Sequence, residues 1–181
     1  MKKVIKHSIF IFLCLVSCLM NAQEVKSPNG NISLRFSLQT GGVPTYSLTY
    51  KGKDVIKPSK LGLELKDNSD VNNDFSDFSV KRIEKEQKED KVSLLNGFEI
   101  ADTKTTAFDE TWQPVWGETK NIRNHYNELA VTLNQKSTDR HILIRFRVFD
   151  DGLGFRYEFP EQKNLVYFVI KEERTQFAMA G

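Results

Sequence analysis

Aromatic, acidic and histidine side chains gather in one irregular stretch of this chain, residues 108–131. Both tryptophans, Trp112 and Trp116, lie there on either side of Pro114. Proline disfavours a helical conformation in the residue before it, so the two indoles cannot share a helix face. On a loop they could form a platform for the apolar face of a sugar ring. The alternative is that they close the end of a β-sandwich as core residues.

Carboxylates accompany the tryptophans at Asp109, Glu110, Glu118 and Glu128. Glycoside hydrolysis uses two carboxyl groups, a proton donor and a base or nucleophile, at a separation that sets the stereochemical outcome. The sequence does not give that separation, and acidic residues are common on any protein surface. Glu118 follows Trp116-Gly117 directly, which makes it the first of the four to test as a sugar contact.

Arg123 and His125 add two polar side chains to the same stretch. His125 could bond a sugar hydroxyl or move a proton, or it could be a histidine held by hydrogen bonds within a loop. His141 begins a strand-like segment and has no evident partner. The pattern lacks a Gly-x-Ser-x-Gly nucleophile elbow and a phosphate-binding glycine loop, and its histidines and cysteines do not suggest zinc.

The elements that must position these residues are β-strands. Apolar and polar residues alternate strictly, as in Ile32, Leu34, Phe36 and Leu38, and this period of two indicates strands with one buried face. Glycine, serine and aspartate mark the turns between them. Expected strands cover residues 32–38, 45–50, 61–65, 129–133, 142–148 and 155–159, with turns at 41–42, 51–53, 137–139 and 151–152. The apolar run 165–170 is predicted to be a strand covered on both faces.

Two polar segments interrupt this pattern. Residues 67–74 are rich in Asn, Asp and Ser but lack the glycine and the final glutamate of a calcium loop, so we interpret them as a solvated connection. Residues 81–91 are rich in Glu and Lys without a helical apolar stripe. We interpret this segment as a charged edge hairpin.

The first 22 residues have the composition of a secretory signal peptide. Lys2, Lys3 and Lys6 precede an uncharged apolar run that is short for a membrane span. Cleavage after Ala22 is favoured over a lipoprotein site at Cys18, so we expect a periplasmic protein without a membrane span in its mature chain. Both cysteines lie in this segment, which leaves the mature chain without a disulfide.

Charge is balanced once the signal is removed. Without its three lysines the chain keeps 23 of its 26 basic residues against 24 acidic ones. A nearly neutral domain has no electrostatic footprint for nucleic acid or for an anionic membrane. The composition is that of a globular domain, and the pattern predicts antiparallel strands in a sandwich.

The run Thr-Trp-Gln-Pro-Val-Trp-Gly-Glu at 111–118, the segment from Arg123 to Leu129 and the turn Asp-Gly-Leu-Gly-Phe-Arg-Tyr at 151–157 resemble the N-terminal domain of glycoside hydrolase family 97. This family includes exported α-glucosidases of Bacteroides-type starch-utilisation systems. The resemblance implies an all-β, antiparallel β-super-sandwich of the galactose-mutarotase type over residues 23–181, incomplete at its C-terminal end. It also implies a catalytic (β/α)8 barrel beyond Gly181, and calcium at the active site of the full-length enzyme.

The resemblance assigns no catalytic residue and no metal ligand to this chain, which on its own is expected to be inactive. It implies that Trp112, Trp116, Glu118, Arg123 and His125 lie at an interface or on the rim of a pocket. The expected partners are the barrel in cis and, through the full-length enzyme, an α-glucan oligosaccharide. The alternatives are a free-standing carbohydrate-binding module and a purely structural interaction domain.

Overall fold

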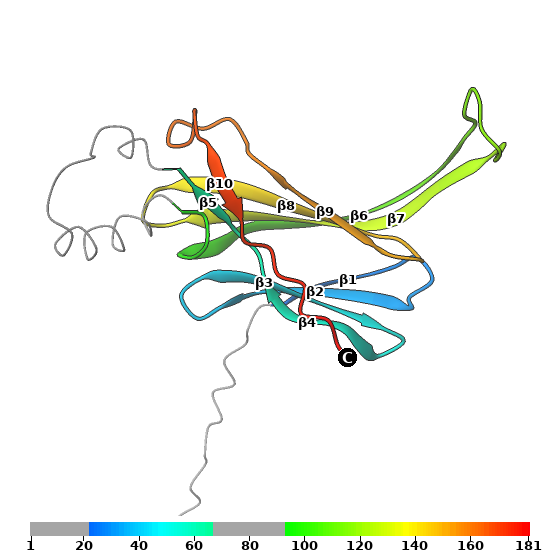
Figure 1. Ribbon diagram of the computed structural model, residues 1–181, viewed down its shortest axis with the longest axis horizontal. Coiled ribbons are helices and arrows are strands. Elements are labelled where there is room, and N and C mark those ends of the chain that lie inside the picture. The colour runs from blue at the N-terminus through cyan, green and yellow to red at the C-terminus, as the bar shows by residue number, and fades with distance from the viewer. Residues whose placement is uncertain (1–21, 67–92) are drawn as a thin grey trace, which may run out of the picture.

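The computed structural model describes residues 22–66 and 93–181, and every regular element within these ranges is a β-strand (Figure 1). The predicted all-β class is confirmed. The strands are β1 (Gln23–Lys26), β2 (Ile32–Gln39), β3 (Val43–Tyr50), β4 (Lys53–Lys60), β5 (Leu63–Leu65), β6 (Phe98–Trp112), β7 (Ile122–Gln135), β8 (Arg140–Val148), β9 (Leu153–Glu158) and β10 (Ile170–Glu173).

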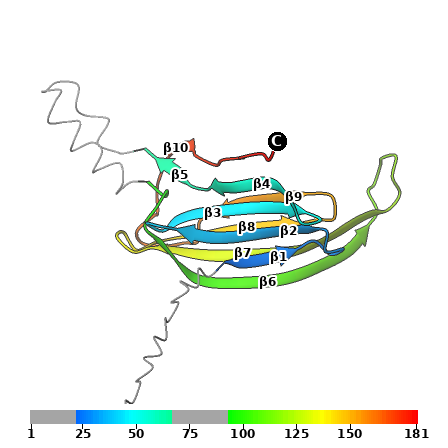
Figure 2. The same ribbon diagram turned by 90° about the horizontal axis from the view of Figure 1, so that it is seen from below.

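Two antiparallel four-stranded sheets lie face to face, one in the order β1-β2-β3-β4 and the other in the order β6-β7-β8-β9 (Figures 1 and 2). A small sheet of β10 and β5 lies at one end. Neighbouring strands in both large sheets follow one another in the chain, as in successive hairpins. The C-terminal segment runs beside β4, with a bridge between Ile56 and Met179.

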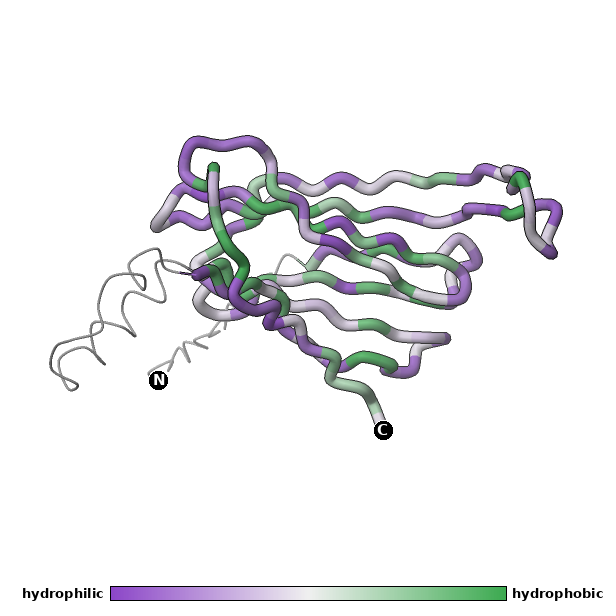
Figure 3. The backbone as a smooth tube through the Cα atoms, turned by 45° about the horizontal axis from the view of Figure 1, so that its top comes forward, coloured by the Kyte–Doolittle hydropathy of each residue, from purple (hydrophilic) through white to green (hydrophobic). Residues whose placement is uncertain are grey.

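The core fills the space between the two large sheets. Hydrophobic and hydrophilic residues are interleaved along the strands, as the hydropathy colouring shows (Figure 3), and in β2 and β8 every second residue is buried. Phe146 of β8 is fully buried, and its ring centroid lies 5.9 Å from that of Phe36 and 6.3 Å from that of Tyr46. Phe155 of β9 extends this aromatic contact, 5.9 Å from both Phe146 and Tyr46.

The turn between β2 and β3 also joins the two sheets. The backbone N–H groups of Gly97 and Phe98 donate to the carbonyls of Gly41 and Gly42, at 2.8 Å and 3.1 Å. Both turn glycines have positive φ, +80° and +69°, which favours glycine. A Cβ atom on Gly42 would lie 2.4 Å from the carbonyl oxygen of Phe98, whereas one on Gly41 would meet nothing within 4 Å. The position of the first residues of β6 therefore depends on the absence of a side chain at Gly42.

A network of ion pairs covers the outer face of β7, β8 and β9. Glu128 is buried and accepts hydrogen bonds from Arg145 and from Arg147, the latter at 2.8 Å. Arg145 also donates to both carboxylate oxygens of Glu158, at 2.7 and 3.0 Å, and Arg156 donates to Glu158 at 2.6 Å. Arg145 and then Arg156 lower the pKa of Glu158 to about 2. The network ties the three strands together on the face opposite the core.

One predicted strand is wrong. Residues 161–169 form no strand, and β10 begins only at Ile170. Val166, Tyr167 and Val169 are exposed, not covered on both faces, while Leu165 alone in this run is buried. The other predicted turns and alternating strands are confirmed, although the segment 61–65 forms only the short β5.

The interpreted polar connection at 67–74 and edge hairpin at 81–91 lie outside the described residues, as does almost all of the predicted signal peptide. In the two described ranges, no helix has the length and apolarity needed to cross a bilayer.

We expect Gly42→Ala to destabilise the protein more than Gly41→Ala. Both variants place an alanine at positive φ, which costs roughly 1–2 kcal/mol. Only Gly42→Ala forces a Cβ against the backbone of Phe98, and overpacking of this kind costs about 1–3 kcal/mol more. Denaturant unfolding of the two variants and the wild type measures the difference. Equal losses would mean that the turn does not anchor β6.

Acid should weaken the outer-face network in a defined pH range. The folded-state pKa of Glu158 is about 2, below its ordinary value of 4.5, so its contribution is present above pH 4.5 and is lost as the pH falls toward 2. The melting temperatures of wild type and Glu158→Gln should therefore differ at neutral pH and converge between pH 4.5 and 2. Thermal melts across this range test the expectation. Curves that stay parallel down to pH 2 would contradict it.

Candidate functional site

A two-stranded ribbon projects from the sandwich and carries most of the predicted site residues (Figure 1). β8 pairs with β7 only from Asn127 onward, so residues 108–126, here called the arm, are paired only within β6 and β7. The expectation of an irregular stretch over 108–131 is wrong for most of its length. Only residues 113–121, at the tip, lie outside the strands.

The arm has two chemically different faces. Side chains alternate along each strand, and directly paired residues share a face. The pairs Phe108 with Tyr126 and Trp112 with Ile122 put aromatic and apolar side chains on one face. The pairs Asp109 with His125 and Thr111 with Arg123 put polar side chains on the other. The arm is thus an amphipathic ribbon.

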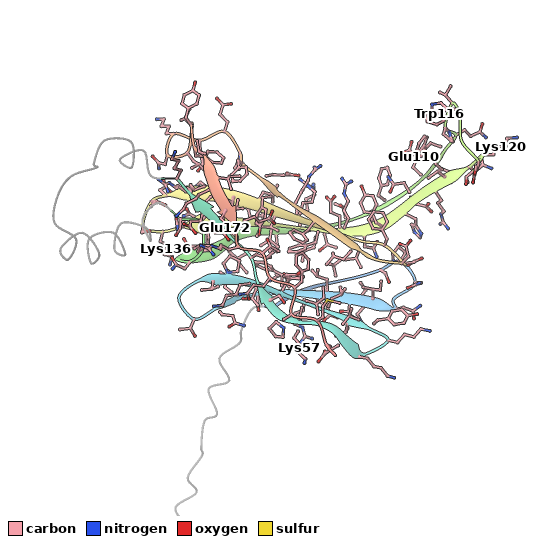
Figure 4. The ribbon with its side chains drawn as sticks, in the orientation of Figure 1. Lys57, Glu110, Trp116, Lys120, Lys136 and Glu172 are labelled. Atoms are coloured by element: carbon pink, nitrogen blue, oxygen red, sulfur yellow. The ribbon has the colours of Figure 1, made fainter. Side chains whose placement is uncertain are left out.

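The tryptophans are solvent-exposed rather than core residues. Trp112, the last residue of β6, is 47% exposed, and Trp116 in the tip is 88% exposed beside the fully exposed Val115. Figure 4 shows Trp116 at the far end of the arm. The alternative that these indoles close the sandwich is therefore wrong. Exposed large apolar groups at one end of a ribbon are typical of a binding surface.

Arg123 and His125 surround Asp109 on the polar face. The Nε and Nη2 groups of Arg123 donate to the two carboxylate oxygens of Asp109, at 2.8 and 2.7 Å. His125 Nε2 lies 4.0 Å from the same carboxylate. Arg123, through its hydrogen bonds, holds the pKa of Asp109 below its ordinary value, so this carboxyl is a poor proton donor. One interpretation of the sequence placed His125 in a loop. The structure places it in β7 instead.

The carboxylates of the stretch are placed differently from one another. Glu110 lies on the aromatic face of the arm and Glu118 lies in the tip, and both are exposed. Glu128 is buried at the base of the arm, where Arg145 and Arg147 bind it. Asp109 is bound by Arg123. Two of the four are thus already held by arginines.

An aromatic stack anchors the arm to the sandwich. Tyr126 is buried, with the ring of Phe108 stacked at 5.1 Å and that of Phe149 tilted at 5.2 Å. The guanidinium of Arg147 lies 4.6 Å from the centre of the Tyr126 ring, a cation–π contact. These contacts link the aromatic face of the arm to the outer-face network.

The sequence interpretation missed Arg145 and Arg147 of the outer face, whereas Arg156 lies in the segment 151–157 that carries the family resemblance. Arg145, Arg147 and Arg156 line a hollow of about 200 Å³ together with Gly154 and Phe155. The signal was present in the sequence, because Arg145 and Arg147 alternate with buried residues of β8 and so had to share one face. His141 lies at the other end of β8 and does have a neighbour, since its Nε2 is 3.7 Å from Asp139.

Comparison with known proteins assigns the chain to a protein family. Residues 25–181 match the family described as glycosyl-hydrolase 97 N-terminal. A retaining alpha-galactosidase from Bacteroides thetaiotaomicron is 24% identical over 157 residues, which are 84% of this chain and 19% of that protein.

Solved structures agree. A glycoside hydrolase family 97 enzyme from Pseudoalteromonas sp. strain K8, solved in complexes with panose and with acarbose, is 31% identical with a TM-score of 0.70. The match covers 87% of this chain and 20% of that one. A beta-arabinopyranosidase is 22% identical with a TM-score of 0.68 over 87% of this chain and 21% of its own, which shows a shared fold.

The chain thus spans about a fifth of the length of these relatives. The matched residues include both large sheets and the arm that projects from the second one. This chain belongs to the glycosyl hydrolase 97 N-terminal family.

Proposed function

We propose that this domain is the N-terminal β-sandwich of an exported α-glucosidase-like enzyme, where it supports a catalytic barrel and contributes the arm to the rim of the pocket. The observation that carries the proposal is the exposure of Trp112, Val115 and Trp116 at the end of a ribbon that leaves the sandwich. A two-stranded ribbon is marginal in water on its own. Its apolar face therefore suits a position against a neighbouring domain.

The residues of the arm suit binding rather than bond cleavage. Indole rings can stack on the apolar face of a sugar, and Glu118, Arg123 and His125 offer groups that can bond hydroxyls. Arg123 still has one terminal amino group, Nη1, that donates to no acceptor among the described residues. The catalytic carboxyl pair is expected from the barrel, so no residue of this domain is proposed as an acid, base or nucleophile.

An α-glucan oligosaccharide is the proposed substrate class. The relative from Pseudoalteromonas, bound to panose and to acarbose in its solved complexes, is 31% identical to this chain. The retaining alpha-galactosidase is the competing precedent, at 24% identity. An α-galactoside is therefore the second substrate class to test.

Calcium is proposed as a cofactor of the full-length enzyme. Calcium takes six to eight oxygen ligands, mostly from carboxylates, carbonyls and water. Nowhere in residues 22–66 and 93–181 do three acidic or histidine side chains come together as such a site would need. These residues alone do not fit a calcium site, so we derive no step through the metal.

Export to the periplasm belongs to the same proposal, because the basic start and apolar run of residues 1–22 suit secretion and a starch-degrading enzyme meets its polymer outside the cytoplasm.

A free-standing carbohydrate-binding module remains the alternative function. The exposed indoles of the arm favour it as well, since they could bind a sugar without a barrel.

Hydrolysis assays with several glycosides test the proposal directly. We expect the full-length protein to hydrolyse panose and maltotriose with a higher kcat/KM than an aryl α-galactoside, and the 181-residue chain alone to hydrolyse none of them. Release of sugar by this chain alone would contradict the assignment of catalysis to the barrel. Faster cleavage of the galactoside would overturn the proposed substrate class.

Trp116→Ala tests the role of the arm. Loss of one stacking aromatic should lower kcat/KM of the full-length enzyme for maltotriose by about fivefold, since such contacts are worth on the order of 1 kcal/mol. Trp116→Phe should retain most of the activity. Tyr167→Ala is the matched control, because Tyr167 is 92% exposed and lies outside the arm. Equal activity in the two alanine variants would exclude the arm from the rim. Saturable binding by this chain alone, lost in Trp116→Ala, would favour the free-standing module.

A further inference from the structure

A missing side chain opens the hollow on the outer face of β8 and β9. Gly154 of β9 is paired with Arg147 of β8, and two residues further along Arg156 is paired with Arg145. A Cβ on Gly154 would meet no atom within 4 Å, and its backbone does not have a positive φ. Backbone strain therefore does not require glycine here. A glycine inside a strand marks a bulge, a tight bend, or the close approach of a ligand or another backbone, and β9 pairs with β8 through Gly154 without a register shift.

Two guanidinium groups beside this glycine have unused donors. Arg147 is held through its Nε by Glu128, at 2.8 Å, and Arg156 through its Nε by Glu158, at 2.6 Å. Among the described residues, neither arginine donates a hydrogen bond from its terminal amino groups. Arg145, in contrast, uses all three of its nitrogens on the two glutamates. Donors remain on both sides of Gly154.

The cluster also has an unbalanced charge. Three arginines against two glutamates leave one positive charge in the hollow. Arg145 and Arg156 are directly opposite each other, and like charges in such pairs destabilise a sheet. A single negative charge would balance the cluster, whereas a dianion would reverse its sign.

The arginines are held in place before any ligand arrives. Glu128 is buried, and Arg147 is fixed between this carboxylate and the face of the Tyr126 ring. Glu158 orients both Arg145 and Arg156. Planar guanidinium groups whose side chains are already ordered lose less entropy on binding.

We propose that this hollow binds a carboxylate through the terminal amino groups of Arg147 and Arg156, over the open position at Gly154. The bound group is an acidic side chain of the polypeptide that packs on this face, or the carboxylate of a small organic acid. Both sources share the planar, singly charged group that guanidinium forks recognise. The proposal does not depend on the enzyme's substrate.

Acetate is the probe for the first experiment. Its titration into the 181-residue chain at constant ionic strength, followed by NMR of the arginine Nε–H signals, should shift Arg147 and Arg156 saturably. Arg156→Lys should weaken binding by about tenfold, because a charge-assisted fork contact is lost. Arg35→Lys is the matched control, since Arg35 is an exposed strand arginine beside Glu24 on the other sheet. No shift, or an equal shift at Arg35, would overturn the proposal.

Gly154→Glu and Gly154→Gln form a second, independent test. Glutamate at this position tethers a carboxylate beside both arginines, while glutamine has the same size without the charge. We expect a higher melting temperature for Gly154→Glu than for Gly154→Gln, and a difference that shrinks in high salt. Equal melting temperatures would count against the site.

The same titration on the full-length protein separates the two sources. If Arg147 and Arg156 respond to acetate in the 181-residue chain but not in the full-length protein, an acidic side chain of the polypeptide fills the hollow. If both proteins respond, the ligand is a small carboxylic acid. A response in neither protein contradicts the proposal.

Discussion

The aromatic contact between the two sheets is the constraint on which the other features depend. Phe146 of β8 packs against Phe36 and Tyr46 of the opposite sheet, and Phe155 continues the contact along β9. A strand alternates its side chains with a period of two, so a slip of one residue would move Phe146 to solvent and an arginine into the core. Burying an unpaired guanidinium costs free energy, whereas burying a phenyl ring stabilises the fold. The core thus selects one register for β8 and, through pairing, for β7 and β9.

That register decides which polar groups meet outside. With Leu129, Val131 and Phe146 inward, Glu128, Arg145 and Arg147 must face outward together. Glu128 is buried even so, because arginines cover it, and a buried carboxylate is tolerable only when it is paired. The same alternation continues into the arm, where it separates the aromatic face from the face of Asp109 and Arg123. No additional element is needed to make the arm amphipathic.

The sequence predicted the sandwich well because its strands are buried on one face only, as the run Ile32, Leu34 and Phe36 illustrates. It did not identify most of β6, since residues 103–111 are exposed or nearly so on both faces and carry no apolar alternation. For residues 165–170 the sequence predicted a buried strand, whereas most of this run is exposed and outside any strand. A run of apolar residues does not by itself distinguish a buried strand from an exposed loop. The tryptophans could be named but not placed. The pairing of Glu128 with two arginines depends on strand register, which is a non-local property.

The arm and the arginine hollow lie on one continuous surface. Phe108, Tyr126 and Arg147 all belong to the outer face of the second sheet, and the contact of Arg147 with the Tyr126 ring, at 4.6 Å, joins the two regions. A protein domain that packs on this face would contact apolar side chains of the arm and positively charged side chains of β8 and β9. An apolar centre with a charged, hydrogen-bonding margin is the usual anatomy of a specific protein interface. The core fixes one register for β7 and β8, so Tyr126 at the base of the arm and Arg147 of the hollow lie next to each other on this face.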